Sequence, residues 1–180
     1  MLEAPWHVLH VFANHEKRVA QHLAARSLEH YLPLYTERSR WTDRSVDVER
    51  PLFTGYVFVR FSPRTRLSLI STPGVIRLLG EDERNRVSCT EIDRIRDGLA
   101  HGCLLRPHSG AALGARVRVK GGVFDGVEGV VTEIRHQCKV IISLSTVQQC
   151  FSLEVELRDI EILNKVVSRD ALRPSLAQAG

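Results

Sequence analysis

The sequence predicts an α+β fold in which helices pack on an antiparallel sheet and a small all-β barrel follows. Segments with helical and with strand periodicity alternate over the first part of the chain, and in the last part the apolar residues recur with a period of two. Between these parts, CLLRPHSGAA has Pro, Gly and small residues without any sustained period. We therefore expect domains at 1–102 and 113–164, a linker at 103–112 and a flexible tail at 165–180.

The first strand and helix follow from the first thirty or so residues. WHVLHVF at 6–12 predicts a strand, and Asn14 offers an N-cap with Glu16 in the first helical turn. We expect a helix over 14–28, because an apolar stripe recurs at helical spacing. The stripe consists of Val19, Ala20, Leu23, Ala24 and Leu28.

Two further strands and a charged hairpin are expected next. HYLPLYT at 30–36 predicts a strand, and RSRWTDRSVDVER predicts a hairpin that turns near Thr42–Asp43. The alternation over 45–49 supports its returning strand, and ERPLFTGYVFVRF at 49–61 predicts a central strand.

This central run is apolar on both of its faces. A half-solvated strand should carry polar residues on one side, so both sides need a cover. Either the chain covers both faces itself, or a partner completes one of them. One expected face is Phe53, Gly55, Val57, Val59 and Phe61, and the other is Leu52, Tyr56 and Phe58.

Two more helices and a strand complete the first domain. Ser62–Pro63 predicts the start of a short helix that stops before Pro73–Gly74, and 75–79 predicts a strand. Thr90 is expected to cap a third helix, which Gly102 closes. The inward positions are Leu67 and Ile70 in the short helix and Ile92, Ile95 and Leu99 in the third helix.

Composition narrows the classes of function. The net charge of +4 and pI of about 9.1 permit contact with nucleic acid without requiring it. No run approaches the eighteen or so apolar residues of a membrane span, and no secretory signal begins the chain, so we expect a soluble cytoplasmic protein. No catalytic motif is present, and we expect no enzyme activity, cofactor or metal. None of Cys89, Cys103, Cys138 and Cys150 has zinc-site spacing.

Two further patterns each allow two interpretations. Arg18, His22 and Arg26 recur every four residues, which suits either a solvated helix face or a stripe that faces phosphates. In VRVKGGVFDGVEGVVTEI at 117–134, glycines crowd into a turn between alternating strands. Phe124 at the tip of this turn is either a lid over the barrel end or an exposed anchor for a partner.

Several of these segments together resemble a known family. The 117–134 segment resembles a KOW motif, and PLFTGYVFVRF resembles the signature strand of the NusG N-terminal (NGN) domain. Trp6, NHEKRVAQHL, HYLPLY and STPGVIRLLG match in the family's order. The chain thus resembles a NusG-type transcription elongation factor, and we favour a specialised paralogue of the RfaH, LoaP or UpxY kind.

The resemblance implies partners and site residues. It implies that Phe53, Tyr56 and Phe58 bind the clamp helices of RNA polymerase and that Arg64–Thr65 reaches across the polymerase cleft. Through Phe124, the KOW domain would bind Rho or ribosomal protein NusE. Contact with non-template or upstream DNA is implied for Trp6, His10, Asn14, Arg18, His22 and Arg26.

The chain departs from the family pattern at three places. The family's F-P-G-Y reads Phe53-Thr54-Gly55-Tyr56, and its G-P-F reads Gly122-Val123-Phe124. STVQQCFSLEVEL at 145–157 replaces a short Gly-Arg turn. Some relatives switch the second domain between helical and barrel forms, and the alternation of β-branched residues here favours the barrel.

Three functions follow as hypotheses. We expect a monomeric regulator that binds the polymerase clamp and promotes processive elongation or antitermination. A housekeeping factor that couples polymerase to Rho or the ribosome is the first alternative, and a ribosome-associated RNA-binding KOW protein is the second.

Overall fold

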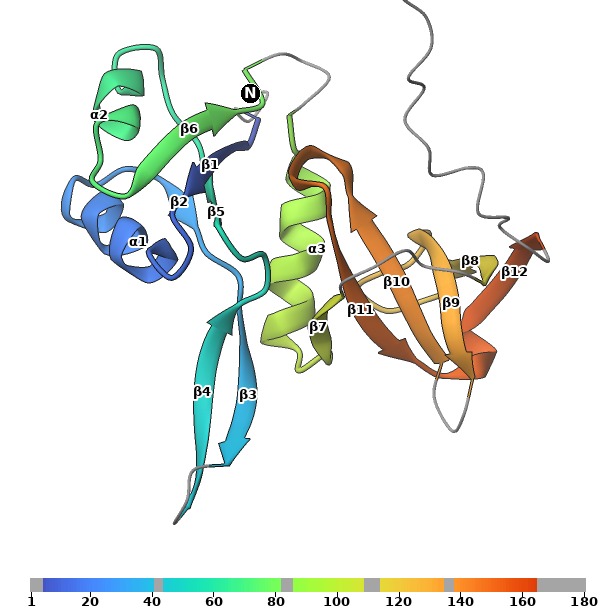
Figure 1. The fold of residues 1–180 in the computed structure, drawn as a ribbon. Coiled ribbons are helices and arrows are strands. Elements are labelled where there is room, and N and C mark those ends of the chain that lie inside the picture. Colours follow the sequence, from blue (N-terminus) through green and yellow to red (C-terminus); the bar gives the residue numbers. More distant parts are fainter. Residues whose placement is uncertain (1–4, 41–43, 82–85, 109–113, 135–137, 165–180) are drawn as a thin grey trace, which may run out of the picture.

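The structure, a computed structural model, describes residues 5–40, 44–81, 86–108, 114–134 and 138–164. An antiparallel sheet of order β2-β5-β1-β6 forms the centre of the N-terminal part, as the sequence predicts. Helices α1 and α2 lie on one side of this sheet, and α3 stands on the other side (Figure 1). Its strands are β1 (His7–Val11), β2 (His30–Tyr31), β5 (Tyr56–Val59) and β6 (Val75–Leu79), and the helices are α1 (Glu16–Ala25), α2 (Arg66–Ile70) and α3 (Cys89–Ala100).

The two faces of β5 pack into two different cores. Val57 and Val59 lie with residues of α1 and α2, whereas Phe58 lies in the larger core that α3 shares. Phe53 was expected on the Val57 face, and this was wrong. Gly55, at φ +82°, turns the chain just before β5, so that Phe53 packs on the Phe58 side.

The predicted helix starts were displaced in each case. Asn14 has φ +64° and precedes the N-cap of α1, which is His15. Helix α2 begins at Arg66 rather than at Ser62–Pro63, because Ser62 N donates to Thr65 Oγ1 in a local turn. Helix α3 is capped by Ser88, not by Thr90.

Ser88 forms a complete capping box with Glu91. Its Oγ accepts a hydrogen bond from Glu91 N at 3.1 Å, and Glu91 Oε2 accepts one from Ser88 N at 3.0 Å. The sequence carries this Ser-x-x-Glu signature two residues before the predicted cap. Gly102 ends the helix as expected, at φ +76°.

The charged hairpin forms a ribbon of its own. Strands β3 (Leu34–Arg40) and β4 (Ser45–Pro51) pair along their full lengths and extend away from the rest of the chain (Figure 1). The predicted strand 30–36 divides at Pro33, whose carbonyl accepts from Leu52 N at 2.9 Å. The predicted turn at Thr42–Asp43 lies outside the described residues.

The C-terminal part is a strongly curved six-stranded antiparallel sheet around an apolar interior, and we call it the barrel (Figure 1). Its order is β12-β8-β9-β10-β11-β7. Val117, Val140 and Leu153 face its interior, as the alternation predicts. The strands are β7 (Leu105–His108), β8 (Ala115–Val119), β9 (Glu128–Ile134), β10 (Cys138–Leu144), β11 (Gln149–Val155) and β12 (Ile160–Asn164).

Strand β7 lies inside the segment that was expected to be a linker. It pairs with β11 from Leu105↔Leu153 to His108↔Cys150. The strand is short and contains Pro107, so it shows no clear period in the sequence. An edge strand tolerates a proline because one side of it makes no ladder bonds.

Candidate partner-binding site

The candidate site is the face of β5 that carries Tyr56 and Phe58, together with Phe53 in the preceding turn. We call it the aromatic face. Phe53 and Phe58 are fully buried and meet edge to face, with 5.6 Å between ring centroids. Tyr56 is half-buried and stacks on His10 at 5.2 Å. The fold therefore brings together the three residues for which the resemblance implies polymerase binding.

The chain's own barrel covers this face. Phe151 of β11 packs edge to face on Phe53 at 5.9 Å, and Phe124 lies 6.2 Å from Phe151. A row of four aromatic rings thus runs from Phe58 through Phe53 and Phe151 to Phe124, and it crosses from the N-terminal sheet into the barrel. Of the two covers considered from the sequence, the described arrangement is the intramolecular one.

Phe124 is a buried contact to α3 in this arrangement. Its side chain is 4% exposed, and it lies against Gly98 of the helix. A Cβ atom added at Gly98 would lie 2.6 Å from Phe124 Cε2. Glycine within a helix costs about 1 kcal/mol relative to alanine, so this position gives up helix propensity to admit a ring. Arg94 Nη2 on the same helix donates to Asp125 O at 3.1 Å.

The loop between β10 and β11 makes a second contact with the aromatic face. Val147 within the loop is 2% exposed, and directly after the loop, at the start of β11, Gln149 Nε2 donates to Thr54 O at 3.0 Å. The loop also forms one wall of a cavity of about 210 Å³ beside Tyr56 and Leu79. This loop belongs to the segment that departs from the family pattern, and the departure therefore lies at the contact between the two parts.

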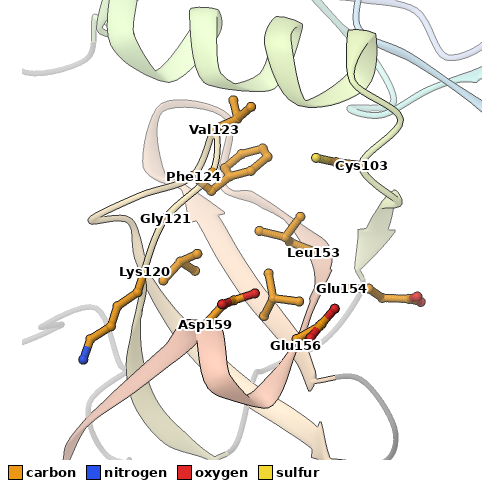
Figure 2. Close-up of a pocket in the computed structure, with 12 residues that line it drawn as sticks. Cys103, Lys120, Gly121, Val123, Phe124, Leu153, Glu154, Glu156 and Asp159 are labelled. Carbon is orange, nitrogen blue, oxygen red and sulfur yellow. The ribbon is translucent and has the colours of Figure 1, made fainter.

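A larger cavity of about 320 Å³ opens at the end of the barrel below α3 (Figure 2). Phe124 and Val123 form its upper wall, next to the helix. Glu156 and Asp159 line the opposite side. Phe124 thus belongs both to the wall of this cavity and to the end of the aromatic row.

The six residues implied in nucleic-acid contact do not form one stripe. Trp6 is 1% exposed, under the guanidinium of Arg60 at 4.6 Å from its ring. Arg26 Nη1 donates to Ser68 O at 2.9 Å and so joins α1 to α2. His10 stacks on Tyr56, His22 is half-buried, and Asn14 and Arg18 are exposed. Contact with nucleic acid through these residues stays a prediction.

The predicted cleft loop lies just before α2. Arg64 is exposed, and Thr65 Oγ1 donates to Ser62 O at 3.0 Å, which fixes the turn. Leu67, in the first turn of α2, is 73% exposed, although the sequence pattern predicted it to point inward. An exposed leucine beside Arg64 is a feature that periodicity alone did not identify.

Burial shapes the electrostatics next to the aromatic face. Burial raises the pKa of Tyr31 to about 12, although the nearby Arg96 guanidinium, 4.9 Å from its ring, opposes this rise. Tyr31 packs on Phe58 at 6.5 Å, so its phenol stays neutral there. Among the described residues, no three His, Cys, Asp or Glu side chains gather as metal ligands would. No helix in the described part is long and apolar enough to span a membrane.

Comparisons with known proteins bear on the same segments. The sequence model of the NusG family, described as transcription termination factor NusG, matches residues 4–96. The transcription termination/antitermination protein NusG of Lactococcus lactis is 28% identical over 87% of this chain and 91% of its own length. Its namesakes from Yersinia pestis and Escherichia coli K12 are 29% and 28% identical, each over 89% of this chain and 99% of their length.

A solved structure has a similar fold. The structure titled "Domain interaction in Thermotoga maritima NusG" aligns with a TM-score of 0.58 and 19% sequence identity. The alignment covers 91% of this chain and 99% of that chain. The likeness therefore extends over both the N-terminal part and the barrel.

Proposed function

Because the chain belongs to the NusG family of transcription termination factors, which are not enzymes, we propose that it regulates elongation by binding RNA polymerase through the aromatic face. Phe53, Tyr56 and Phe58 would contact the clamp helices of the polymerase. The observation that carries the proposal is the group of aromatic side chains at Phe53, Tyr56 and Phe58. Among the helices of the described part, α3 alone packs on this side of the sheet. The rest of the cover comes from the barrel.

The proposed binding has a competitor within the chain. Burying an aromatic side chain contributes about 1.5–3 kcal/mol, so two or three such rings are enough to anchor a partner. Phe151 and the β10–β11 loop already provide this burial for Phe53 and Tyr56. Polymerase must therefore displace the barrel, and its apparent affinity is lowered by the fraction of molecules in which the face is covered.

Once bound, the protein would act as a bridge. The turn at Arg64–Thr65 would reach the opposite side of the polymerase cleft and hold the clamp closed, which would suppress pausing. The exposed side chains of Asn14 and Arg18 would lie toward upstream DNA. Antitermination or anti-pausing is the expected result.

A second candidate is the housekeeping activity, and the names of the relatives from Lactococcus lactis and Yersinia pestis, which are termination/antitermination proteins, are equally consistent with it. In that case the barrel, once displaced, would present Phe124 to Rho or to ribosomal protein NusE. A Rho-dependent termination assay separates the two candidates. A specialised antiterminator should reduce termination, and a housekeeping factor should increase it.

Tyr56→Ala is the variant that tests polymerase binding. Phe58→Ala is unsuitable, because emptying a fully buried phenylalanine site costs about 3–5 kcal/mol of stability. Tyr56 is half-buried, so its truncation should leave the fold intact while polymerase affinity falls about tenfold or more. Phe12→Ala, which removes a ring that is 57% exposed outside the aromatic face, serves as the control.

The measurement is a titration of polymerase at two salt concentrations. Equal binding by the Tyr56→Ala and wild-type proteins would refute the proposed face. A steep loss of binding with salt for both proteins would indicate phosphate contacts, and thus the RNA-binding alternative.

A further inference from the structure

The connection between the N-terminal part and the barrel is much shorter than the sequence predicts. Helix α3 ends at Ala100 and strand β7 begins at Leu105, so only residues 101–104 lie between them. Residues 105–108 of the segment that was expected to connect the domains loosely instead form an edge strand of the barrel sheet. It occupies the edge of β11, the same strand that places Phe151 on the aromatic face.

Strand β7 makes contacts with three parts of the molecule. Leu105 is fully buried, and its Cδ1 lies 3.7 Å from the position of a Cβ added at Gly98. The guanidinium of Arg106 lies 5.1 Å from the ring centroid of Tyr35 in the β3–β4 ribbon. On the barrel side, Ser152 Oγ donates to Arg106 O at 3.4 Å. One short strand thus connects α3, the ribbon and the barrel.

The pairing of β7 limits how far the barrel can move. Four extended residues span at most about 14 Å, little more than the 10–12 Å diameter of one helix with its side chains. If β7 leaves β11, residues 101–114 separate α3 from β8, and fourteen residues can span about 50 Å. While β7 stays paired, the start of the barrel sheet remains within about 14 Å of the end of α3, and release of β7 lets the barrel move several times farther away, which makes room for a partner built of several helices.

Strand β7 is also weakly held at its C-terminal residues, Pro107 and His108. Pro107 has no N–H to donate and is exposed at the sheet edge. His108 is half-buried, and Leu105 is the one residue of β7 whose side chain is fully covered. Such a strand can be released at a smaller cost than any strand with neighbours on both sides.

We propose that β7 is a releasable clasp, which holds the barrel on the aromatic face and must separate from β11 when the partner binds there. This inference rests on the proposed function, because the partner is RNA polymerase. Release converts a short connection into a long tether, so that the barrel stays attached and becomes free to reach a second partner. The β10–β11 loop and Phe124 leave their contacts in the same step.

A disulfide to a native cysteine tests the clasp. Cys150 lies directly opposite His108 on β7 and opposite Ser143 on β10. His108→Cys can therefore lock β7 to β11, and Ser143→Cys, a matched control with the same partner cysteine, can lock β10 to β11 inside the barrel. Ser143 Oγ already lies 3.2 Å from Cys150 Sγ. Mass spectrometry of the intact, oxidised proteins reports whether each bond has formed.

The locked clasp should block the partner. Oxidised His108→Cys is expected to bind polymerase at least tenfold more weakly than its reduced form, while oxidised Ser143→Cys and wild type bind as their reduced forms do. Amide hydrogen exchange is the second measurement, and it requires no disulfide. On adding polymerase to the wild-type chain, β7 amides should lose protection while the β8–β9 pair keeps it.

Two results would overturn the clasp. One is equal polymerase binding by oxidised and reduced His108→Cys, and the other is unchanged protection of β7 in the polymerase complex. If neither the wild type nor any variant binds polymerase, the proposed function fails. Amide hydrogen exchange in the free chain then tests the clasp independently of polymerase. In that case β7 amides must exchange faster than those of the β8–β9 pair, and equal rates would exclude a releasable strand.

Discussion

Substituting Gly98 by alanine should open the contact between α3 and the barrel. The added Cβ would lie 2.6 Å from Cε2 and 2.7 Å from Cζ of Phe124, which is closer than carbon atoms can approach. The ring has little room to retreat, because it is 4% exposed and packs on Phe151. Overpacking of this kind costs about 1–3 kcal/mol, and only the closed arrangement incurs that cost.

The same substitution stabilises the helix in both arrangements. Alanine is favoured over glycine within a helix by about 1 kcal/mol, whether or not the barrel is in place. The closed-to-open equilibrium should therefore shift by the overpacking cost alone, a factor of about 5 to 150. Polymerase affinity should rise by up to that factor until the open form predominates.

The assay combines polymerase titration with amide hydrogen exchange over α3 and the Gly121–Gly126 turn. Gly98→Ala should bind polymerase more tightly and lose protection in that turn. Phe124→Ala in the same chain restores the space. Gly98→Ala should therefore change polymerase affinity and protection less in a Phe124→Ala background than in the wild-type background. Unchanged protection and unchanged affinity in Gly98→Ala would refute the role given to this glycine.

Other expectations concern single groups. Glu16 is buried, and its Oε1 accepts a hydrogen bond from Gly55 N at 2.6 Å; glutamine can still accept this bond but without the charge, so Glu16→Gln should lower the free energy of unfolding by about 1 kcal/mol in urea titrations. The pKa of Tyr31 is raised to about 12 by burial, so stability should fall as pH rises from about 10 toward 12, and Tyr31→Phe should remove this dependence. The hydrogen bond from Arg66 lowers the pKa of Glu81, so this pair should stabilise at neutral pH, lose its effect as pH falls through that depressed pKa, and be weakened by salt. Urea midpoints of Glu81→Gln that follow pH as the wild type does would contradict this.

Local patterns predicted the elements that depend on local interactions. Strand β6 occupies Val75–Leu79 as expected, because the preceding Pro73–Gly74 marks its start. Helix α3 places Ile92 and Ile95 inward as their spacing indicates. The family resemblance added the three aromatic residues, which the structure does bring together.

What the sequence did not predict depends on contacts between distant segments. Phe53 changed face because Gly55 turns the chain, and Trp6 lies in the apolar core with the guanidiniums of Arg60 and Arg96 near its ring. The barrel over the aromatic face could not be read from either domain separately. Gly98, however, was a usable signal, because a glycine in the middle of a good helix pattern suggests close packing by another group.

The row of rings from Phe58 to Phe124 means that the two parts share one hydrophobic interior while they are together. Any substitution that improves packing in this shared interior should raise the melting temperature and at the same time lower the affinity for the partner. Heat resistance and activity should therefore vary in opposite directions across variants of Phe124 and Phe151, the two positions of the row that belong to the barrel. Selection for a regulator that opens readily would then keep this shared interior less tightly packed than the highest stability would require.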